Sequence, residues 1–232
     1  MKKRDFGIIS VVTIFAVAMA FLESTVVVYL RKLYYENGFD FPLKGFIEPQ
    51  ILNIEWVREF FTIVMLLCVG YLAGKKFNER FAYFLYSFAV WDIFYYVWLK
   101  VMLDWPASLM TWDLLFLIPW PWAGPVLAPI ICSLTMTWFA FCLIEKKNRK
   151  IKTTEWILLF AGGFVILYTF VIDYGALIVG GNYLKDFLTL ATNAEFSSII
   201  SSYVPSFYNW LLFWLGEISI IISISMFCFR KK

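Results

Sequence analysis

The sequence predicts an all-α integral membrane protein: a six-helix transmembrane bundle with a short re-entrant or interfacial helix and outer amphipathic helices. The first observation is composition, because 62% of the 232 residues are hydrophobic and only 16% are charged, whereas roughly 25% of an ordinary soluble domain is charged. The second is that the apolar residues gather in runs of about 20, the length of a bilayer-spanning helix. The third is that Lys and Arg cluster at alternate ends of these runs, as the positive-inside rule requires.

A segment in lipid must satisfy its own backbone hydrogen bonds, so each long apolar run is expected to be a helix. The chain is interpreted as a single transmembrane domain, residues 1–232. Its predicted spans are approximately 6–30, 56–73, 81–103, 125–144, 155–179 and 208–229.

The basic residues predict the topology. Fourteen of the 20 lie at one set of span ends: Lys2, Lys3, Arg4, Lys75, Lys76, Arg80, Lys146, Lys147, Arg149, Lys150, Lys152, Arg230, Lys231 and Lys232. Cytoplasmic loops carry such an excess of Lys and Arg. Both termini are therefore expected in the cytoplasm, with the chain in the inner or plasma membrane of the cell.

The first span begins like a secretory signal, with basic residues at 2–4 and a small-residue motif at 18–20. The apolar run continues well beyond that motif, which favours an uncleaved span. Ala16, Ala20 and Ser24 recur every four residues. This spacing is typical of closely packed membrane helices, so we interpret these residues as a packing face.

Polar side chains mark the next two spans. The second span begins with a stripe at i, i+3, i+4 and i+7, made of Glu55, Arg58, Glu59 and Thr62. The third span carries Asp92 near its middle, Tyr96 one turn later and Lys100 one turn beyond that. Residues at this spacing share a helix face. Lys100 could therefore fold back toward Asp92.

The segment between the third and fourth spans must return the chain to the same membrane face. Pro106 suits the first turn of a helix, and Pro119 and Pro121 prevent its continuation. We predict a short helix over about 106–118, at roughly 20 Å too short to cross the membrane. Its low charge favours a re-entrant or bundle-buried position over an interfacial one, and it would form a wall of the functional site. The alternative is a corner anchored by its tryptophans at the membrane interface.

Two outer connections are long. Residues 31–55 contain glycines and prolines and are expected to form an irregular loop. Residues 183–203 instead show apolar side chains at helical spacing. We predict two short amphipathic helices here, lying on the outer interface or capping the bundle.

Charged residues within spans cost about 2.5–3.5 kcal/mol each near the bilayer centre, so they indicate function. Those of this chain fall in the outer half or near the midplane, which predicts an acidic and aromatic cavity open to the outside. The candidate ligand or ion pathway comprises Glu23, Arg58, Glu59, Asp92, Tyr96, Trp112, Asp113, Trp120, Trp122 and Glu217.

Some of these carboxylates have a simpler explanation, because a buried acid can pair with a nearby base to fix helix packing. We expect Glu23 to pair with Arg31 and Glu59 with Arg58. Asp92 has no basic residue close to it in its span, and neither has Glu217 in the sixth span. These two are the strongest candidates for a ligand or proton-linked role.

Several functions are excluded by what the sequence lacks. It contains no His, which excludes imidazole-ligated haem and zinc sites and Ser-His or Cys-His catalysis. We find no catalytic motif, and we predict no cofactor, no metal site and no nucleic-acid partner. The four cysteines lie in apolar runs without C-x-x-C spacing and are expected to be buried thiols: Cys68, Cys132, Cys142 and Cys228.

Three functions remain open. The favoured one is binding or transport of a small solute or ion. The alternatives are a membrane-embedded enzyme acting on a lipid-type substrate at the outer leaflet, and a non-catalytic subunit or assembly factor that packs against a membrane partner or another copy. The general layout, with the pair Ala16 and Ala20 in the first span, is similar to that of the membrane substrate-binding components of energy-coupling-factor vitamin transporters, which implies solute binding. The segment 104–129 has no counterpart there.

Overall fold

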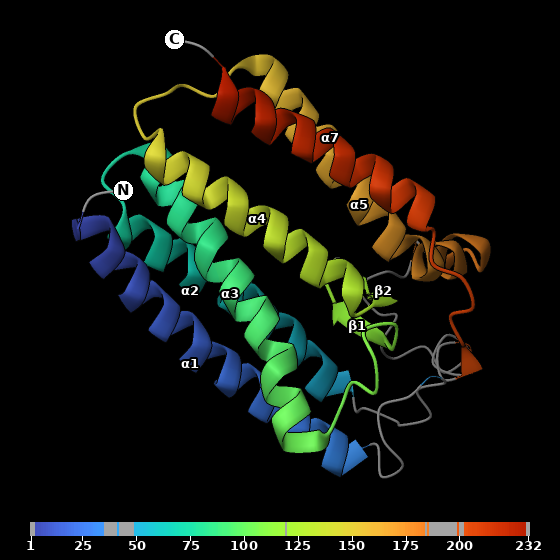
Figure 1. Cartoon of the computed structure of the whole chain (residues 1–232). Coiled ribbons are helices and arrows are strands. Elements are labelled where there is room, and N and C mark those ends of the chain that lie inside the picture. The colour runs from blue at the N-terminus through green and yellow to red at the C-terminus, as the bar shows by residue number, and fades with distance from the viewer. Residues whose placement is uncertain are drawn as a thin grey trace.

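A computed structural model describes residues 3–34, 41, 49–118, 120–183, 185, 199 and 202–230. The elements in these residues are the helices α1 (Lys3–Tyr34), α2 (Pro49–Ala73), α3 (Phe77–Leu103), α4 (Leu127–Glu145), α5 (Thr153–Gly180) and α7 (Trp210–Phe229), with the strands β1 (Trp112–Phe116) and β2 (Trp122–Pro125). Both termini lie at the same end of the bundle, and the strands lie near the other end (Figure 1).

Five of the helices are long and apolar enough to cross a membrane. They are α1, α2, α4, α5 and α7, and by length and composition they make the chain a multi-pass membrane protein. The predicted span 81–103 lies in α3, whose 27 residues would extend about 40 Å. No stretch of α3 is as apolar as those of the other five helices, so a six-span bundle remains a prediction.

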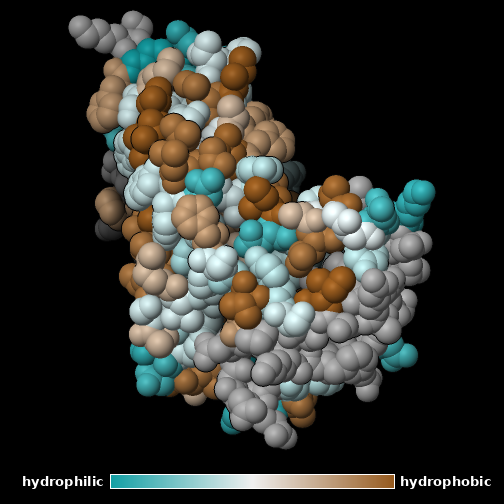
Figure 2. Space-filling view, turned by 90° about the vertical axis from the view of Figure 1, so that its right-hand side faces the viewer, coloured by the Kyte–Doolittle hydropathy of each residue, from teal (hydrophilic) through white to brown (hydrophobic). Residues whose placement is uncertain are grey.

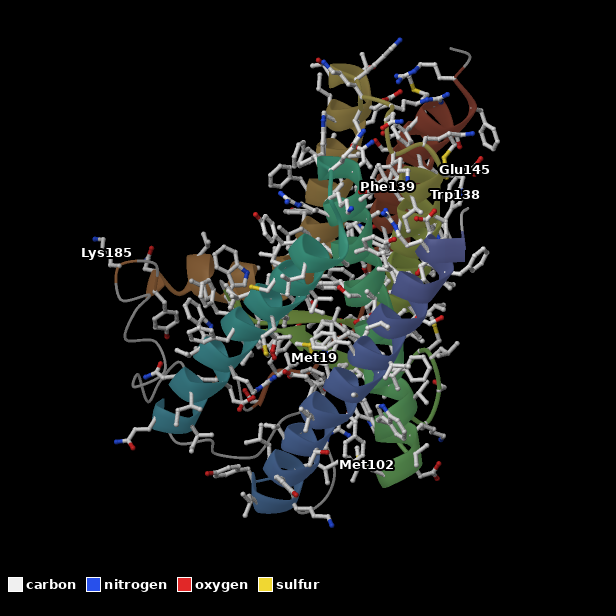
Figure 3. The ribbon with its side chains drawn as sticks, turned by 90° about the vertical axis from the view of Figure 1, so that its left-hand side faces the viewer. Met19, Met102, Trp138, Phe139, Glu145 and Lys185 are labelled. Carbon is white, nitrogen blue, oxygen red and sulfur yellow. A yellow bond between two sulfur atoms is a disulfide. The ribbon has the colours of Figure 1, made fainter. Side chains whose placement is uncertain are left out.

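The position of α3 explains how its polar residues are accommodated. It packs against α1, α2 and α4, while α5 and α7 pair with each other and join the rest through α4 and β2. In Figure 3, Met102 lies near one end of the bundle, Glu145 near the other, and Met19 between them. In Figure 2, brown apolar side chains cover much of the upper part of this face, with teal hydrophilic ones at its top and others in the middle, at the right and at the lower left. Protein contacts on three sides therefore accommodate the polar residues of α3.

Small residues form the contact between α1 and α3. Ala16, Ala20 and Ser24 are fully buried. The Ser24 hydroxyl donates to the carbonyl of Ala20 at 2.7 Å and to that of Tyr95 on α3 at 3.1 Å. The packing face predicted from their spacing is confirmed.

Glycines allow the backbones of α5 and α7 to touch. A Cβ added at Gly162 would lie 2.6 Å from the carbonyl oxygen of Gly216, and one added at Gly216 would lie 2.8 Å from that of Gly162. No side chain fits between the two helices at this level.

The prediction of a helix over 106–118 is wrong. Residues Trp112–Phe116 form β1 and pair antiparallel with β2, with Trp112 opposite Pro125. The pairing continues into α4, because the Val126 amide donates to the carbonyl of Thr111 at 3.0 Å. Prolines on the connecting turn and an apolar run favour the hairpin, whose ladder satisfies backbone groups that a broken helix would leave free.

The end of α3 also differs from the prediction. Asp104 directly follows α3 and adopts the left-handed conformation, with φ 53°. Its carboxylate pairs with Lys100 at 2.7 Å. Lys100 therefore points toward the end of the helix and not back toward Asp92.

The prediction of four buried thiols is wrong for one pair of cysteines and for Cys68. Cys142 of α4 and Cys228 of α7 form a disulfide, with their Cα atoms 5.9 Å apart. Cys68 is a free, exposed cysteine and Cys132 is free and half-buried. The predicted amphipathic helices over 183–203 and much of the predicted loop 31–55 lie outside the described residues.

The contact between α5 and α7 gives a first prediction. Gly162→Ala should lower the free energy of unfolding in detergent by about 1–3 kcal/mol, because the new methyl group overlaps the α7 backbone. Gly163→Ala is the matched control, since an added Cβ there meets nothing within 4 Å. Thermal unfolding of both variants tests this contact, and equal midpoints for the two would contradict it.

Candidate functional site

Buried and half-buried polar side chains form a layer across the half of the bundle that adjoins the hairpin; Arg58 and Asp92 are its half-buried charged members. We call this set the acidic layer; its charged members are Glu23, Arg31, Glu55, Arg58, Glu59, Asp92, Asp113 and Glu217. Between this layer and the opposite end lies the largest apolar core, which includes Val12, Leu66, Phe139, Leu143 and Phe227.

Arg58 is the cation of the α1–α2 contact. Its Nε donates to Glu55 Oε2 at 2.9 Å, and its Nη1 forms an ion pair with Glu23 of α1. The Thr62 hydroxyl donates to the other oxygen of Glu23 at 2.6 Å. The structure thus gives Glu23 the partner Arg58, whereas the sequence suggested Arg31. One guanidinium serves two carboxylates, so the group keeps a surplus negative charge.

Glu59 holds the hairpin. Its Oε2 accepts a hydrogen bond from the Leu117 amide at 2.8 Å, and Trp56, also on α2, donates to the Leu117 carbonyl at 2.8 Å. The helix α2 thus provides a hydrogen-bond partner for both the backbone amide and the backbone carbonyl of Leu117. Arg58 acts on Glu59 through its charge, but its side-chain hydrogen bonds go to Glu23 and Glu55.

Asp113 lies on β1 and is 1% exposed. It accepts a hydrogen bond from the Tyr96 hydroxyl at 3.2 Å. Burial raises the pKa of the Asp113 carboxyl from 3.8 to about 7, although the Arg31 charge and Tyr96 favour the ionised form. The Arg31 guanidinium stacks on Trp105 at 3.9 Å. A cation on an aromatic face therefore already exists beside this carboxyl.

The helix α4 supplies hydroxyl groups to the two central carboxylates. Ser133 donates to Asp92 of α3 at 2.8 Å, and Thr135 donates to Glu217 Oε2 of α7 at 2.9 Å. Since residues two apart point to nearly opposite sides of a helix, α4 separates Asp92 from Glu217. The Cys132 thiol interacts electrostatically with both. The two carboxylates thus converge on one helix but do not face each other.

Glu217 is the least satisfied carboxylate of the layer. It is 1% exposed, and its Oε1 has no hydrogen-bond partner of ordinary geometry among the described residues. Buried polar atoms are normally paired, so such an atom calls for an explanation.

The three predicted tryptophans pack the hairpin against other elements. Trp122 stacks on Phe170 of α5 with ring centroids 6.2 Å apart, and Trp120 donates to the Val171 carbonyl at 3.1 Å. Trp112 meets Tyr208 edge to face at 6.0 Å. Trp120 and Trp122 therefore fasten the hairpin to α5, apart from Asp92 and Glu23.

Several residues of the layer were missing from the predicted pathway. They are Arg31, Glu55, Thr62, Tyr95, Trp105, Cys132, Ser133, Thr135 and Tyr208. Glu55 and Thr62 belonged to the stripe visible in the second span. Ser133 and Thr135 are polar residues in an apolar span, a weaker signal, because membrane hydroxyls also bond to their own helix.

No group of three His, Cys, Asp or Glu side chains in the described ranges is arranged to hold a metal ion. No protein family, curated protein or solved structure was found to match the chain. The similarity in layout to vitamin-transporter components therefore receives no support from these comparisons.

The Asp113 carboxyl gives a second prediction. A folded-state pKa of about 7 above an unfolded value of 3.8 means that the folded protein binds the extra proton between these pH values. Its stability should fall as pH rises through this window, and the destabilisation should be fully present above pH 7. Asp113→Asn should make the stability of the folded protein less dependent on pH in this range.

Thermal midpoints of both proteins in detergent between pH 5 and 8 measure the difference. Other carboxyls contribute equally to the two curves, so parallel curves would refute this reading of Asp113. Asp104→Asn is the control, because Asp104 is exposed.

Proposed function

We propose that this protein binds and transports a small cation or cationic solute through the acidic layer. The layer contains six carboxyl groups and two guanidinium groups: Glu23, Glu55, Glu59, Asp92, Asp113 and Glu217 against Arg31 and Arg58. An uncompensated charge in a low-dielectric interior is costly, so surplus carboxylates are neutralised by protons or by a bound cation. The chemistry of the layer therefore favours positively charged cargo.

The main support is the environment of Asp92 and Glu217. Neither forms an ion pair with a residue in the described part of the chain, and each is held by a neutral hydroxyl group. A carboxylate kept only to fix packing would gain most from a basic partner. Ser133 and Thr135 orient the carboxyl groups without neutralising them, which suits sites that must bind and release a positive charge.

Aromatic side chains near these carboxylates suggest that the transported cation can also be organic. Tyr95 and Tyr96 lie in edge-to-face contact with centroids 5.1 Å apart, and Tyr208 donates to or accepts from the Thr169 hydroxyl at 2.8 Å. Aromatic faces attract cations when water is excluded. With the termini in the cytoplasm, as the basic residues predict, the acidic layer would lie toward the outside and the hairpin would cover it there.

Transport is the third prediction. In proteoliposomes, Asp92→Asn and Glu217→Gln should each reduce potential-driven proton influx, or uptake of radiolabelled tetraethylammonium, at least tenfold. Asp104→Asn and Glu145→Gln are matched controls, because both carboxylates are exposed and pair with a neighbouring lysine. Gel filtration checks that each variant is folded.

Wild-type flux in folded variants of both Asp92 and Glu217 would overturn the proposal. A bound lipid converted by the wild type and not by the variants would instead support the enzyme alternative. Silent variants in a protein that always purifies with a larger membrane complex would support the subunit alternative.

A further inference from the structure

A second site lies at the opposite end of the bundle, where both termini lie (Figure 1). A cavity of about 610 Å³ opens where α3 and α5 begin, beside the α4–α5 connection. Four of its lining residues are cationic: Lys76, Lys147, Arg149 and Lys150. Phe77 and Trp156 form part of its apolar wall. We call this cavity the basic pocket; it shares no residue with the acidic layer.

The positive charge of the pocket is only partly compensated. Lys147 lies 3.2 Å from Glu79, and Arg149 donates to the Phe227 carbonyl at 2.5 Å. Lys76 donates to the neutral amide oxygen of Asn148 at 2.6 Å. Across the described ranges, neither Lys76 nor Lys150 forms an ion pair with a carboxylate. The pocket therefore has a surplus of positive charge and lysine donors to offer an anion.

Hydrogen bonds from side chains to backbone carbonyls hold the pocket in shape. Asn78 of α3 donates to the Arg149 carbonyl at 2.7 Å, and Arg230, at the end of α7, donates to the Lys150 carbonyl at 2.9 Å. The connection bearing the cations is thus fastened on two sides. A preformed site loses less entropy when its ligand binds.

An aromatic strip extends from the pocket along the two helices. Trp156 lies 6.3 Å from Phe77, 5.8 Å from Phe81 and 5.4 Å from Phe160, measured between ring centroids. Phe77 and Phe160 are 63% and 59% exposed. In a membrane this strip faces the acyl chains directly beside the basic pocket. A soluble anion has no acyl chains and would not pack against this strip.

We propose that the basic pocket binds the phosphate group of an anionic phospholipid, with the acyl chains against the aromatic strip. Lysine ammonium groups bind phosphate as point charges, and basic pockets between membrane helices are suited to lipid headgroups. The shared chemistry is that of a phosphate anion. The aromatic strip assigns it to a lipid of the adjoining leaflet and not to free phosphate.

Native mass spectrometry of the full chain from mixed phosphatidylcholine and phosphatidylglycerol nanodiscs tests the site. The wild type should retain phosphatidylglycerol in preference to phosphatidylcholine. The double variant Lys76→Gln, Lys150→Gln should lose this preference, by up to about 30-fold for two charges near the membrane surface. The control is the double variant Lys75→Gln, Lys146→Gln, which removes the same charge at the same end of the bundle but outside the pocket lining. It should retain the preference for phosphatidylglycerol.

A second arm separates the two sources of phosphate. Phosphatidylglycerol should raise the thermal midpoint of the wild type, and inorganic phosphate or glycerol 3-phosphate in phosphatidylcholine nanodiscs should not. Equal stabilisation by the soluble anions would overturn the lipid assignment, and no preference in either arm would overturn the site. Asp92 and Glu217 are intact throughout, so the result does not depend on transport.

Discussion

Hydrocarbon offers no hydrogen bonds, and the need to pair backbone groups and keep charged side chains away from lipid governs how these helices are arranged. The helix α3, which lacks an apolar stretch as long as those of the other helices, carries Asn78, Asp92 and Tyr96 and packs against α1, α2 and α4. The helices α1 and α2, whose spans are more apolar, can then expose large side chains such as Ile14 and Phe60.

The same requirement explains how a hairpin can sit against a helical bundle. The two strands satisfy each other, and the amides of Val126 and Leu127 continue the pairing into the first turns of α4. At the far end of β1, Glu59 and Trp56 satisfy the amide and carbonyl of Leu117. Irregular backbone therefore persists here because protein groups take the place of water.

Charge is handled differently at the two ends. Near the termini, Glu155 is fully buried but pairs with Arg230 at 2.5 Å, and Glu79 pairs with Lys147. In the acidic layer, Asp92 and Glu217 receive hydroxyl groups and no cation from the described residues. Paired charges fix the helix ends in place, whereas the unpaired surplus is free to respond to a proton or cation.

The apolar helices, the packing face at Ala16 and Ala20, and most of the acidic residues of the layer could be predicted from the sequence, because length, hydropathy and spacing are local properties of a chain. The hairpin was missed because strand pairing joins segments across a turn, and a short apolar run permits helix or strand equally. Three features became visible only in the folded chain: Glu23 pairs with Arg58, Cys142 bonds to Cys228 across 86 residues of sequence, and four cations line one pocket. Each of these features depends on the relative rotation and translation of packed helices, and the sequence of a single segment does not specify either.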